Sequence, residues 1–346
     1  MTMELKLLPG LLVPWYRENR RELPWRADRE PYHVWLSEIM LQQTRVEAVK
    51  GYYARFLDAL PDIPSLARCD DERLHKLWEG LGYYSRVRNL KKAAQVIMDE
   101  HGGVFPEDYD AVRALPGIGD YTAGAVTSIA FGQPRAAVDG NVLRVLARLR
   151  CDGEPIDLPA AKKRVQQELE AVYPIDCAGE FTQALMELGA TVCVPNGEPK
   201  CAVCPCAAVC EGKRQWREYP VKLPKKGKRL ENRTVFLLRC GDRYAIEKRP
   251  DRGLLATLWQ FPGCDGHLTA EQALSWAQGK GLHPRNVERM IERSHIFTHI
   301  RWDMRGWFLE VDAAAPEYVW RTLEEIDEQA ALPTAFRQFR EVIEDV

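Results

Sequence analysis

The 346-residue chain has no long apolar stretch and almost no net charge. No run of about 18 apolar residues occurs, so the sequence offers no segment that would cross a bilayer as a helix. Residues 1–13 lack the basic segment and sustained apolar run of a secretory signal. We therefore expect a cytoplasmic protein without a membrane partner.

The formal net charge of −2 excludes a protein that binds polyanions over its whole surface. Any nucleic-acid interface must then be a local patch. Internal repeats and low-complexity tracts are also missing. The composition is otherwise that of a globular protein, and the length allows two domains, each with its own core.

Cysteine, by contrast, is abundant and unevenly distributed. Five of the ten cysteines fall between positions 193 and 210, whereas a secreted disulfide framework would spread them along a short chain. Four thiolates suit Zn²⁺ or an iron–sulfur cluster, and the spacing leaves both open. The spacing is C-x7-C-x2-C-x5-C over Cys193, Cys201, Cys204 and Cys210, with Cys206 to spare.

The apolar pattern divides the chain into two parts. Residues 5–217 show the three- to four-residue spacing of successive helices, separated by Gly and Pro. Residues 219–229 hold five basic residues and no acid, which is typical of a solvated linker and would also suit contact with phosphate. Beyond them an α+β domain is expected, with a hairpin at 234–248, strands at 296–302 and 306–311, and helices from about 269, 321 and 334.

The segment His33–Val46 is predicted to be a helix with one unusual residue. Glu38 shares its face with the mostly apolar set Val34, Trp35, Leu41 and Gln42. Burial there would raise the pKa of the carboxyl group. The alternative is a partly exposed Glu at the edge of the helix. An acid beside the amides that follow would suit protonation and recognition of a heterocycle.

A second carboxylate, Asp139, precedes the helix predicted over residues 141–149. One interpretation is a helix cap and nothing more, which is compatible with a catalytic role, and the N–H donors of the helix end should hold the carboxylate ionised. Glu38 would then be the neutral acid and Asp139 the anion. Cleavage of a glycosidic bond requires such a pair, because the leaving group needs a proton and the sugar cation needs a negative charge.

The sequence Leu115-Pro116-Gly117-Ile118-Gly119 lies between two helical segments. Its glycines allow close backbone approach, and the following helix would offer free N–H groups to a DNA phosphate. An ordinary tight turn between helices is the alternative.

Together these motifs resemble those of the MutY-type adenine DNA glycosylases, which belong to the endonuclease III helix-hairpin-helix superfamily. The likeness covers nearly the whole chain. It rests on the four cysteines and on L-P-W-R (Leu23–Arg26), S-E-I-M-L-Q-Q-T-R-V (Ser37–Val46), W-E-G-L-G-Y-Y-S-R (Trp78–Arg86), L-P-G-I-G-D-Y-T-A (Leu115–Ala123), V-D-G-N-V (138–142) and M-E-L-G-A (Met186–Ala190).

The resemblance implies a multidomain fold. An all-α helix-hairpin-helix glycosylase domain over residues 1–217 would include a cluster loop at 193–210. A linker at 218–230 would lead to an α+β, MutT-like (Nudix-like) lesion-recognition domain at 231–346. The resemblance also implies a [4Fe–4S] cluster on the four cysteines. Seven residues separate Cys193 from Cys201 where the family usually has six, which implies a one-residue bulge near Asn196-Gly197.

The implied activity is base excision repair by hydrolytic removal of adenine mispaired with 8-oxoguanine or guanine in duplex DNA. Glu38 would protonate N7 of the extruded adenine, and Asp139, supported by Asn141, would stabilise the sugar cation. The remaining roles would be an adenine pocket of Trp25, Arg26, Leu41, Val46 and Glu187, and DNA or lesion contacts from Gln43, Thr44, Leu81, Tyr83, Gly117, Gly119, Phe297, Thr298 and His299.

Tyr121 distinguishes this chain from bifunctional relatives that also cut the DNA backbone. Those relatives carry Lys at this position to form a Schiff base, which Tyr cannot do. The resemblance thus implies a monomeric, monofunctional glycosylase that associates with the nucleoid through DNA. It also allows replication or repair proteins as partners. The acidic helix of true Nudix hydrolases is missing after Gly263, so nucleotide hydrolysis is not expected. An endonuclease III-like enzyme and a non-catalytic lesion-binding protein remain the alternatives.

Overall fold

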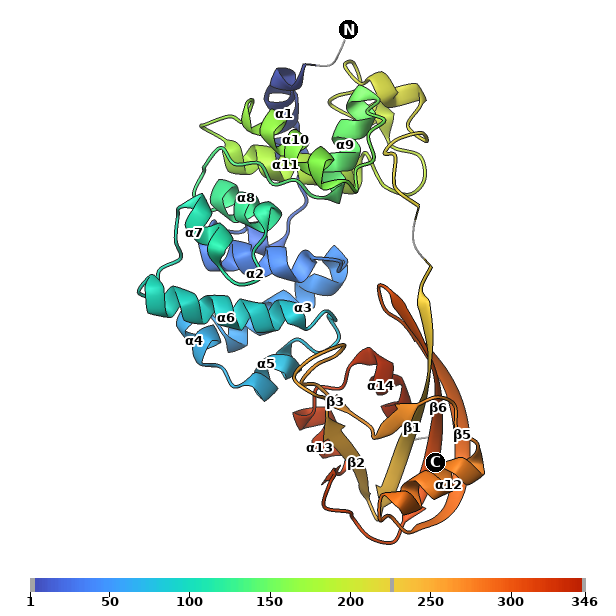
Figure 1. Ribbon diagram of the computed structural model, residues 1–346. Helices are drawn as coiled ribbons and strands as arrows, with labels where there is room; N and C mark the ends of the chain where they lie inside the picture. Colours follow the sequence, from blue (N-terminus) through green and yellow to red (C-terminus); the bar gives the residue numbers. More distant parts are fainter. Residues whose placement is uncertain (1–3, 225–226, 344–346) are drawn as a thin grey trace. The chain divides into compact units, whose positions relative to one another are not determined.

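The computed structural model describes residues 4–224 and 227–343, which fold as two compact units (Figure 1). The first, here called the helical unit, comprises residues 1–68 and 88–224. The second, here called the sheet unit, comprises residues 69–87 and 225–346. Among the described residues, no helix has both the length and the apolar character needed to span a membrane.

The helical unit confirms the all-α character that the spacing predicts. Its core is formed largely by α1, α9, α10 and α11, with Tyr16, Leu146 and Phe181 fully buried. The helices are α1 (Leu8–Asn19), α2 (Pro31–Leu41), α3 (Val46–Ala59), α4 (Ile63–Arg68), α6 (Ser85–Glu100, shared with the other unit), α7 (Tyr109–Ala114), α8 (Asp120–Ile129), α9 (Gly140–Arg150), α10 (Pro159–Glu170) and α11 (Ala178–Thr191), with short 3-10 turns at Leu5–Leu7, Pro24–Arg26, Cys201–Val203 and Glu211–Arg214.

The sheet unit is built on a seven-stranded sheet with the order β3-β2-β1-β6-β5, in which β4 also pairs with β1 and β7 with β2. The pair β1–β6 is parallel and the pair β5–β6 antiparallel. The strands are β1 (Arg229–Cys240), β2 (Arg243–Lys248), β3 (Trp259–Gln260), β4 (Gly263–Asp265), β5 (Pro284–Ile296), β6 (Ile300–Val311) and β7 (Val319–Arg321).

Helices cover both faces of this sheet. Side chains alternate along β1, so Val235 and Leu237 pack with the cluster of α13 (Leu323–Gln329) and α14 (Thr334–Arg340). The intervening Phe236 and Leu238 pack with α12 (Ala270–Gly279). The expected capping box at the start of α12 is confirmed, with Thr269 and Gln272 capping each other.

The strand predicted at 306–311 is confirmed as the second half of β6, but its predicted start at Gly306 and the predicted bounds 296–302 are wrong. Strand β5 ends at Ile296 and a turn follows, so the first range straddles a turn between two strands. Gly306 does not start a strand but lies inside β6. A Cβ atom there would lie 2.6 Å from the ring of Phe339, so the glycine admits the close approach of α14 rather than ending the strand.

Residues 69–87 group with the sheet unit, although the sequence places them within the predicted helical domain. Helix α5 (Asp71–Leu77) starts this segment, and two carboxylates attach it to the sheet residues. Glu72 accepts a hydrogen bond from Trp259 Nε1 at 2.9 Å. Buried Glu79 accepts one from the Leu332 backbone N–H at 3.0 Å and pairs with Lys76 and Arg337.

Replacing Glu79 with Ala is expected to destabilise the sheet unit by about 1–3 kcal/mol, because the buried Leu332 N–H loses its acceptor. Hydrogen exchange measured by mass spectrometry should show faster exchange in the peptide that contains Leu332. Glu271→Ala, an exposed change on α12, is the control. Unchanged protection of Leu332 in the Glu79 variant would contradict this interpretation.

Candidate active site

A cavity of about 870 Å³ opens in the helical unit. It is lined by α2 and the turn after it, the starts of α8 and α9, one side of α11 and the loop before α10. All four predicted catalytic residues and all five predicted pocket residues line it. These are Glu38, Tyr121, Asp139, Asn141, Trp25, Arg26, Leu41, Val46 and Glu187.

Helix α2 places Glu38 in the cavity wall. The helix is buried almost all round, and Glu38 is 6% exposed, so the alternative of a Glu at an exposed edge is excluded. The Tyr121 hydroxyl of α8 donates a hydrogen bond to Glu38 Oε2 at 2.5 Å. Burial raises the pKa of Glu38 to about 7, the Tyr121 hydrogen bond lowers it, and the nearby Asp139 charge raises it.

Asp139 is the N-cap of α9. Its Oδ1 accepts from the Val142 backbone N–H at 2.8 Å, and its Oδ2 accepts from Asn141 Nδ2 at 2.6 Å. The expectation of a lowered pKa is wrong, because burial raises the pKa of Asp139 by more than these donors lower it. The donors still distinguish the two carboxyl groups, since within residues 4–224 and 227–343 the side chain that donates a hydrogen bond to Glu38 is that of Tyr121 alone.

Arg144, one turn further along α9, braces this arrangement. Its Nη2 donates to Asn141 Oδ1 at 2.9 Å and to the Gly189 carbonyl at 2.7 Å, and its Nε donates to the Cys193 carbonyl at 2.9 Å. Asn141 is therefore held between Arg144 and Asp139, with its amide nitrogen turned to the carboxylate. The sequence motif V-D-G-N-V located Asn141 but gave no sign of the arginine behind it.

Glu187 on α11 is fully buried and bound by two arginines. Arg26 Nη2 donates to Oε2 at 2.7 Å, and Arg21 contacts both carboxylate oxygens through Nε and Nη2 at 2.6 and 2.9 Å. These partners lower the pKa of Glu187 although burial opposes them. Arg21 lines the cavity and was not predicted, because the sequence of the charged run Arg17–Glu22 does not distinguish Arg21 from the other arginines in it.

The turn after α2 presents Gln43 and Thr44 at the same cavity. Gln43 has a φ of 57°, which turns the chain sharply and ends the helix earlier than the predicted His33–Val46. Between α7 and α8, Gly117 has a φ of 78° and a Cβ there would lie 2.6 Å from Asn89 Cβ. Gly119 is the extended N-cap of α8, so the two glycines lie in a short turn between two helices, as the sequence predicts.

The cysteine loop lies at the end of α11. Cys193, Cys201, Cys204 and Cys210 all line one small cavity of about 30 Å³, and Cys206 is buried beside them. No three Cys, His, Asp or Glu side chains in residues 4–224 and 227–343 form a group that could hold a single metal ion. Four thiols on one cavity are nonetheless a donor set suited to a metal cluster. The loop turns at Gly197, with a φ of 78°, where the extra residue was expected.

The remaining predicted DNA contacts lie in the sheet unit. The Tyr83 hydroxyl and Thr298 Oγ1 are 3.3 Å apart, and Tyr83 has a φ of 47° and is exposed. The Phe297 ring packs edge-on against Trp302 with centroids 4.8 Å apart. Leu81 is buried and His299 is exposed. The segment 69–87 and the turn 297–299 thus meet within one unit.

Two family profiles match the chain. Residues 36–174 match "HhH-GPD superfamily base excision DNA repair protein", and residues 234–342 match "NUDIX domain". A curated adenine DNA glycosylase of Mus musculus is 34% identical over 404 residues, covering 96% of this chain and 77% of that protein. One of Buchnera aphidicola subsp. Acyrthosiphon pisum is 33% identical over 84% of this chain and 82% of its own. The chain belongs to the adenine DNA glycosylase family.

Membership of the adenine DNA glycosylase family makes the protein a base excision repair enzyme acting on DNA. A solved structure of a thermostable thymine-DNA glycosylase supports the helical fold, with 29% identity and a TM-score of 0.56 over 61% of this chain and 97% of that one. The predicted combination of a helix-hairpin-helix domain and a Nudix-like domain is confirmed. Endonuclease III-like glycosylases usually carry an iron–sulfur cluster, and the four cysteines provide the matching donors.

Proposed function

We propose that the protein hydrolytically removes adenine mispaired with 8-oxoguanine or guanine in duplex DNA, after the adenosine is flipped into the helical-unit cavity. The observation that carries this proposal is that buried Glu38 and partly buried Asp139 line the same cavity, with Tyr121 bonded to Glu38. Base flipping is required because the glycosidic bond cannot be reached inside the duplex.

Glu38 is the general acid in this proposal. With a pKa of about 7 it is about half protonated at pH 7, and the protonated form transfers its proton to N7 of adenine. The C1′–N9 bond then breaks, and its electron pair leaves with the base. The like charge of Asp139 favours one shared proton, and Glu38 keeps it because fewer donors stabilise its anion.

Asp139 is the anion that faces the sugar. As C1′ becomes an oxocarbenium-like cation, the carboxylate at the start of α9 stabilises the charge. A water molecule then adds to C1′ and releases its proton, which leaves an abasic sugar. Asn141 keeps the Asp139 carboxylate in place through its 2.6 Å hydrogen bond. The Glu187–Arg26 pair, with Trp25, Leu41 and Val46, forms the proposed adenine pocket.

Tyr121 supports a monofunctional enzyme. It occupies the position where a Schiff-base lysine would stand, and burial raises the pKa of its hydroxyl further, so it acts as a neutral donor to Glu38. We infer that abasic-site lyase activity is absent. Borohydride trapping should give no covalent complex with the wild type, whereas Tyr121→Lys is expected to give one.

Replacing Tyr121 with Phe should shift the pH dependence of excision. The Tyr121 hydrogen bond stabilises the Glu38 carboxylate, so its loss raises the pKa of Glu38. We expect the decline of the single-turnover rate with rising pH to begin at a higher pH in the variant. A decline that stays at the wild-type pH would show that this hydroxyl does not set the protonation of Glu38.

Recognition of the opposite base is assigned to the sheet unit and the hairpin. Thr298 offers a hydroxyl for 8-oxoguanine beside Tyr83, and Phe297 and His299 flank it. Tyr83 and Leu81 would enter the base stack, Gln43 and Thr44 would contact the strand opposite adenine, and Gly117 and Gly119 would meet a backbone phosphate. Cys193, Cys201, Cys204 and Cys210 would hold a [4Fe–4S] cluster, which would cross-link the loop 193–210 when bound.

The proposal is tested by single-turnover base release from duplexes with adenine opposite 8-oxoguanine, guanine or cytosine. Adenine release that is fastest opposite 8-oxoguanine and negligible opposite cytosine is expected. Release of oxidised pyrimidines instead would favour the endonuclease III-like alternative. Tight lesion binding without base release would favour a non-catalytic lesion-binding protein.

A further inference from the structure

The segment that leads from the cysteine loop towards the sheet unit is held against the edge of the active-site cavity. The Ile156 N–H donates to the Val221 carbonyl and the Leu223 N–H donates to Asp157 Oδ2, both at 3.1 Å. Buried Arg148 donates from Nε to the Tyr219 carbonyl at 3.0 Å. Lys222, flanked by these contacts, lines the cavity. Residues 219–223 are therefore a fixed part of the helical unit rather than a freely solvated linker.

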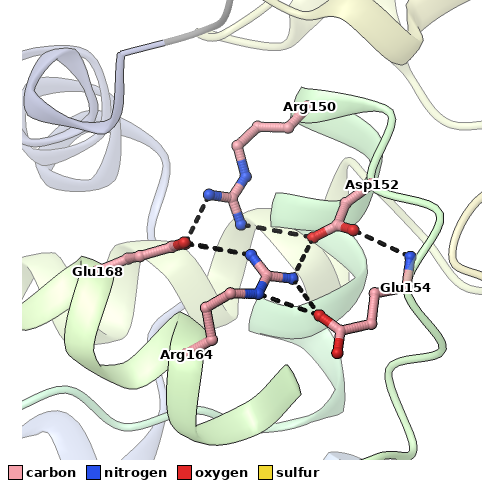
Figure 2. Close-up of polar contacts among 5 residues, drawn as sticks. All are labelled: Arg150, Asp152, Glu154, Arg164 and Glu168. Atoms are coloured by element: carbon pink, nitrogen blue, oxygen red, sulfur yellow. Dashed lines mark hydrogen bonds and ion pairs between the residues drawn. The ribbon is translucent and has the colours of Figure 1, made fainter. Parts of the chain in front are cut away.

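The loop that holds this segment is itself fixed by charge. Figure 2 shows Arg164 of α10 between Asp152, Glu154 and Glu168, with Arg150 bonded to Glu168. Arg150 Nη1 lies 2.6 Å from Glu168 Oε2, and Arg164 Nη2 lies 2.8 Å from Glu154 Oε2. A network of several charges holds geometry better than isolated surface pairs do. It fastens the loop between α9 and α10, which carries Ile156 and Asp157.

Two lysines at this edge of the cavity are available for an anion. Lys162, on the first turn of α10, and Lys222 both line the cavity and both are exposed. The cavity arginines Arg21 and Arg26 are already bound to Glu187. Within residues 4–224 and 227–343, neither lysine forms an ion pair with a carboxylate. The nearby Asp157 carboxylate is engaged by the Leu223 N–H.

We propose that Lys162 and Lys222 form a binding subsite for the DNA phosphodiesters that flank the extruded adenosine. The subsite rests on the proposed function, since it presupposes a nucleotide turned into this cavity. The interior carries the Asp139 carboxylate, which repels phosphate. The sugar can reach Asp139 only if its phosphates stay at the edge of the cavity. Two ammonium groups that form no ion pair with a carboxylate in the described residues, one on a fixed loop and one on a helix, hold the phosphates there.

The subsite is tested with Lys222→Ala and Lys162→Ala, using Lys163→Ala as the matched control, because Lys163 is the exposed neighbour on α10 that does not line the cavity. Binding to a duplex with a non-cleavable adenosine analogue is measured from 50 to 200 mM salt. Each lost phosphate contact lowers the slope of log K against log[salt] by about 0.9. Raising the salt from 50 to 200 mM lowers the affinity of the wild type by some factor. That factor should be about 3.5 times smaller in each cavity variant and the same as the wild type in the control.

Neutral methylphosphonates at the two phosphates beside the adenosine locate the contact. One of them should weaken binding of the wild type and the control but have little further effect on Lys222→Ala or Lys162→Ala. Cavity variants with the wild-type salt slope, or with the full methylphosphonate effect, would overturn the subsite. If the wild type still releases adenine in that case, the proposed function stands and this inference alone fails.

Discussion

Replacing Glu38 with Gln is expected to lower the single-turnover rate of adenine release by about 10²–10⁴-fold, the usual contribution of a general acid. Gln has nearly the same shape and can still accept the Tyr121 hydrogen bond, but it has no proton to give. Rapid-quench measurement of base release at saturating enzyme isolates this step from binding. Glu271→Gln, exposed on α12, should leave the rate unchanged. A Glu38 variant that cleaves at the wild-type rate would show that the acid lies elsewhere.

The same substitution is expected to stabilise the protein above neutral pH. The pKa of Glu38 is about 7 in the folded state against 4.5 unfolded, so the folded state binds more protons between these values. Folding therefore becomes less favourable as pH rises through that window, and the cost stays constant above it. Removing the ionisable group should recover about 3 kcal/mol at pH 8 and little at pH 4. Thermal unfolding at both pH values measures this. Equal midpoint shifts at both would contradict a raised pKa.

Replacing Asp139 with Asn should separate activity from stability. Asn is as good an N-cap as Asp, so the bond from the Val142 N–H is retained and α9 should remain intact. In the proposed mechanism this removes the negative charge that faces the sugar, and we expect excision to slow by about 10²–10³-fold, as when other preorganised electrostatic groups are removed. Single-turnover excision and thermal unfolding of the same preparation provide the two measurements.

Asp108→Asn is the matched control for this change. Asp108 caps α7 in the same way, accepting from the Ala111 N–H at 2.9 Å, but it does not line the cavity. Its substitution should affect neither activity nor stability appreciably. If Asp139→Asn loses no more activity than this control, the charge of Asp139 is not required.

The parts of the site that could be predicted from sequence are those set by local pattern. The apolar neighbours of Glu38 at helical spacing allowed burial or an exposed edge, and Asp139 with the Leu115–Gly119 motif favoured burial, which is what raises the pKa of Glu38. The position of Asp139 before a helix predicted its capping bonds. The depth at which that helix end lies is a tertiary property, however, so the direction of the Asp139 pKa was wrong.

Other features depend on contacts between distant segments. Arg21 meets Glu187 across 166 positions of sequence, and no local pattern distinguishes it from its charged neighbours. Gly306 resembles a strand break in the sequence, whereas in the fold the glycine makes room for the ring of Phe339. The sequence does not distinguish Glu79 from the other acidic residues in and near α5, and its hydrogen bond from the Leu332 N–H is seen only in the fold. Sequence periodicity identified the elements, but these long-range pairings became visible only in the folded chain.

The central claim is that a protonated Glu38 drives adenine excision. It is tested most directly by the single-turnover rate on a duplex with adenine opposite 8-oxoguanine, measured from pH 5 to pH 9. With a Glu38 pKa of about 7, the rate should decline about tenfold per pH unit above that value. A rate that stays constant or rises through pH 9 would contradict the assignment of Glu38 as the acid.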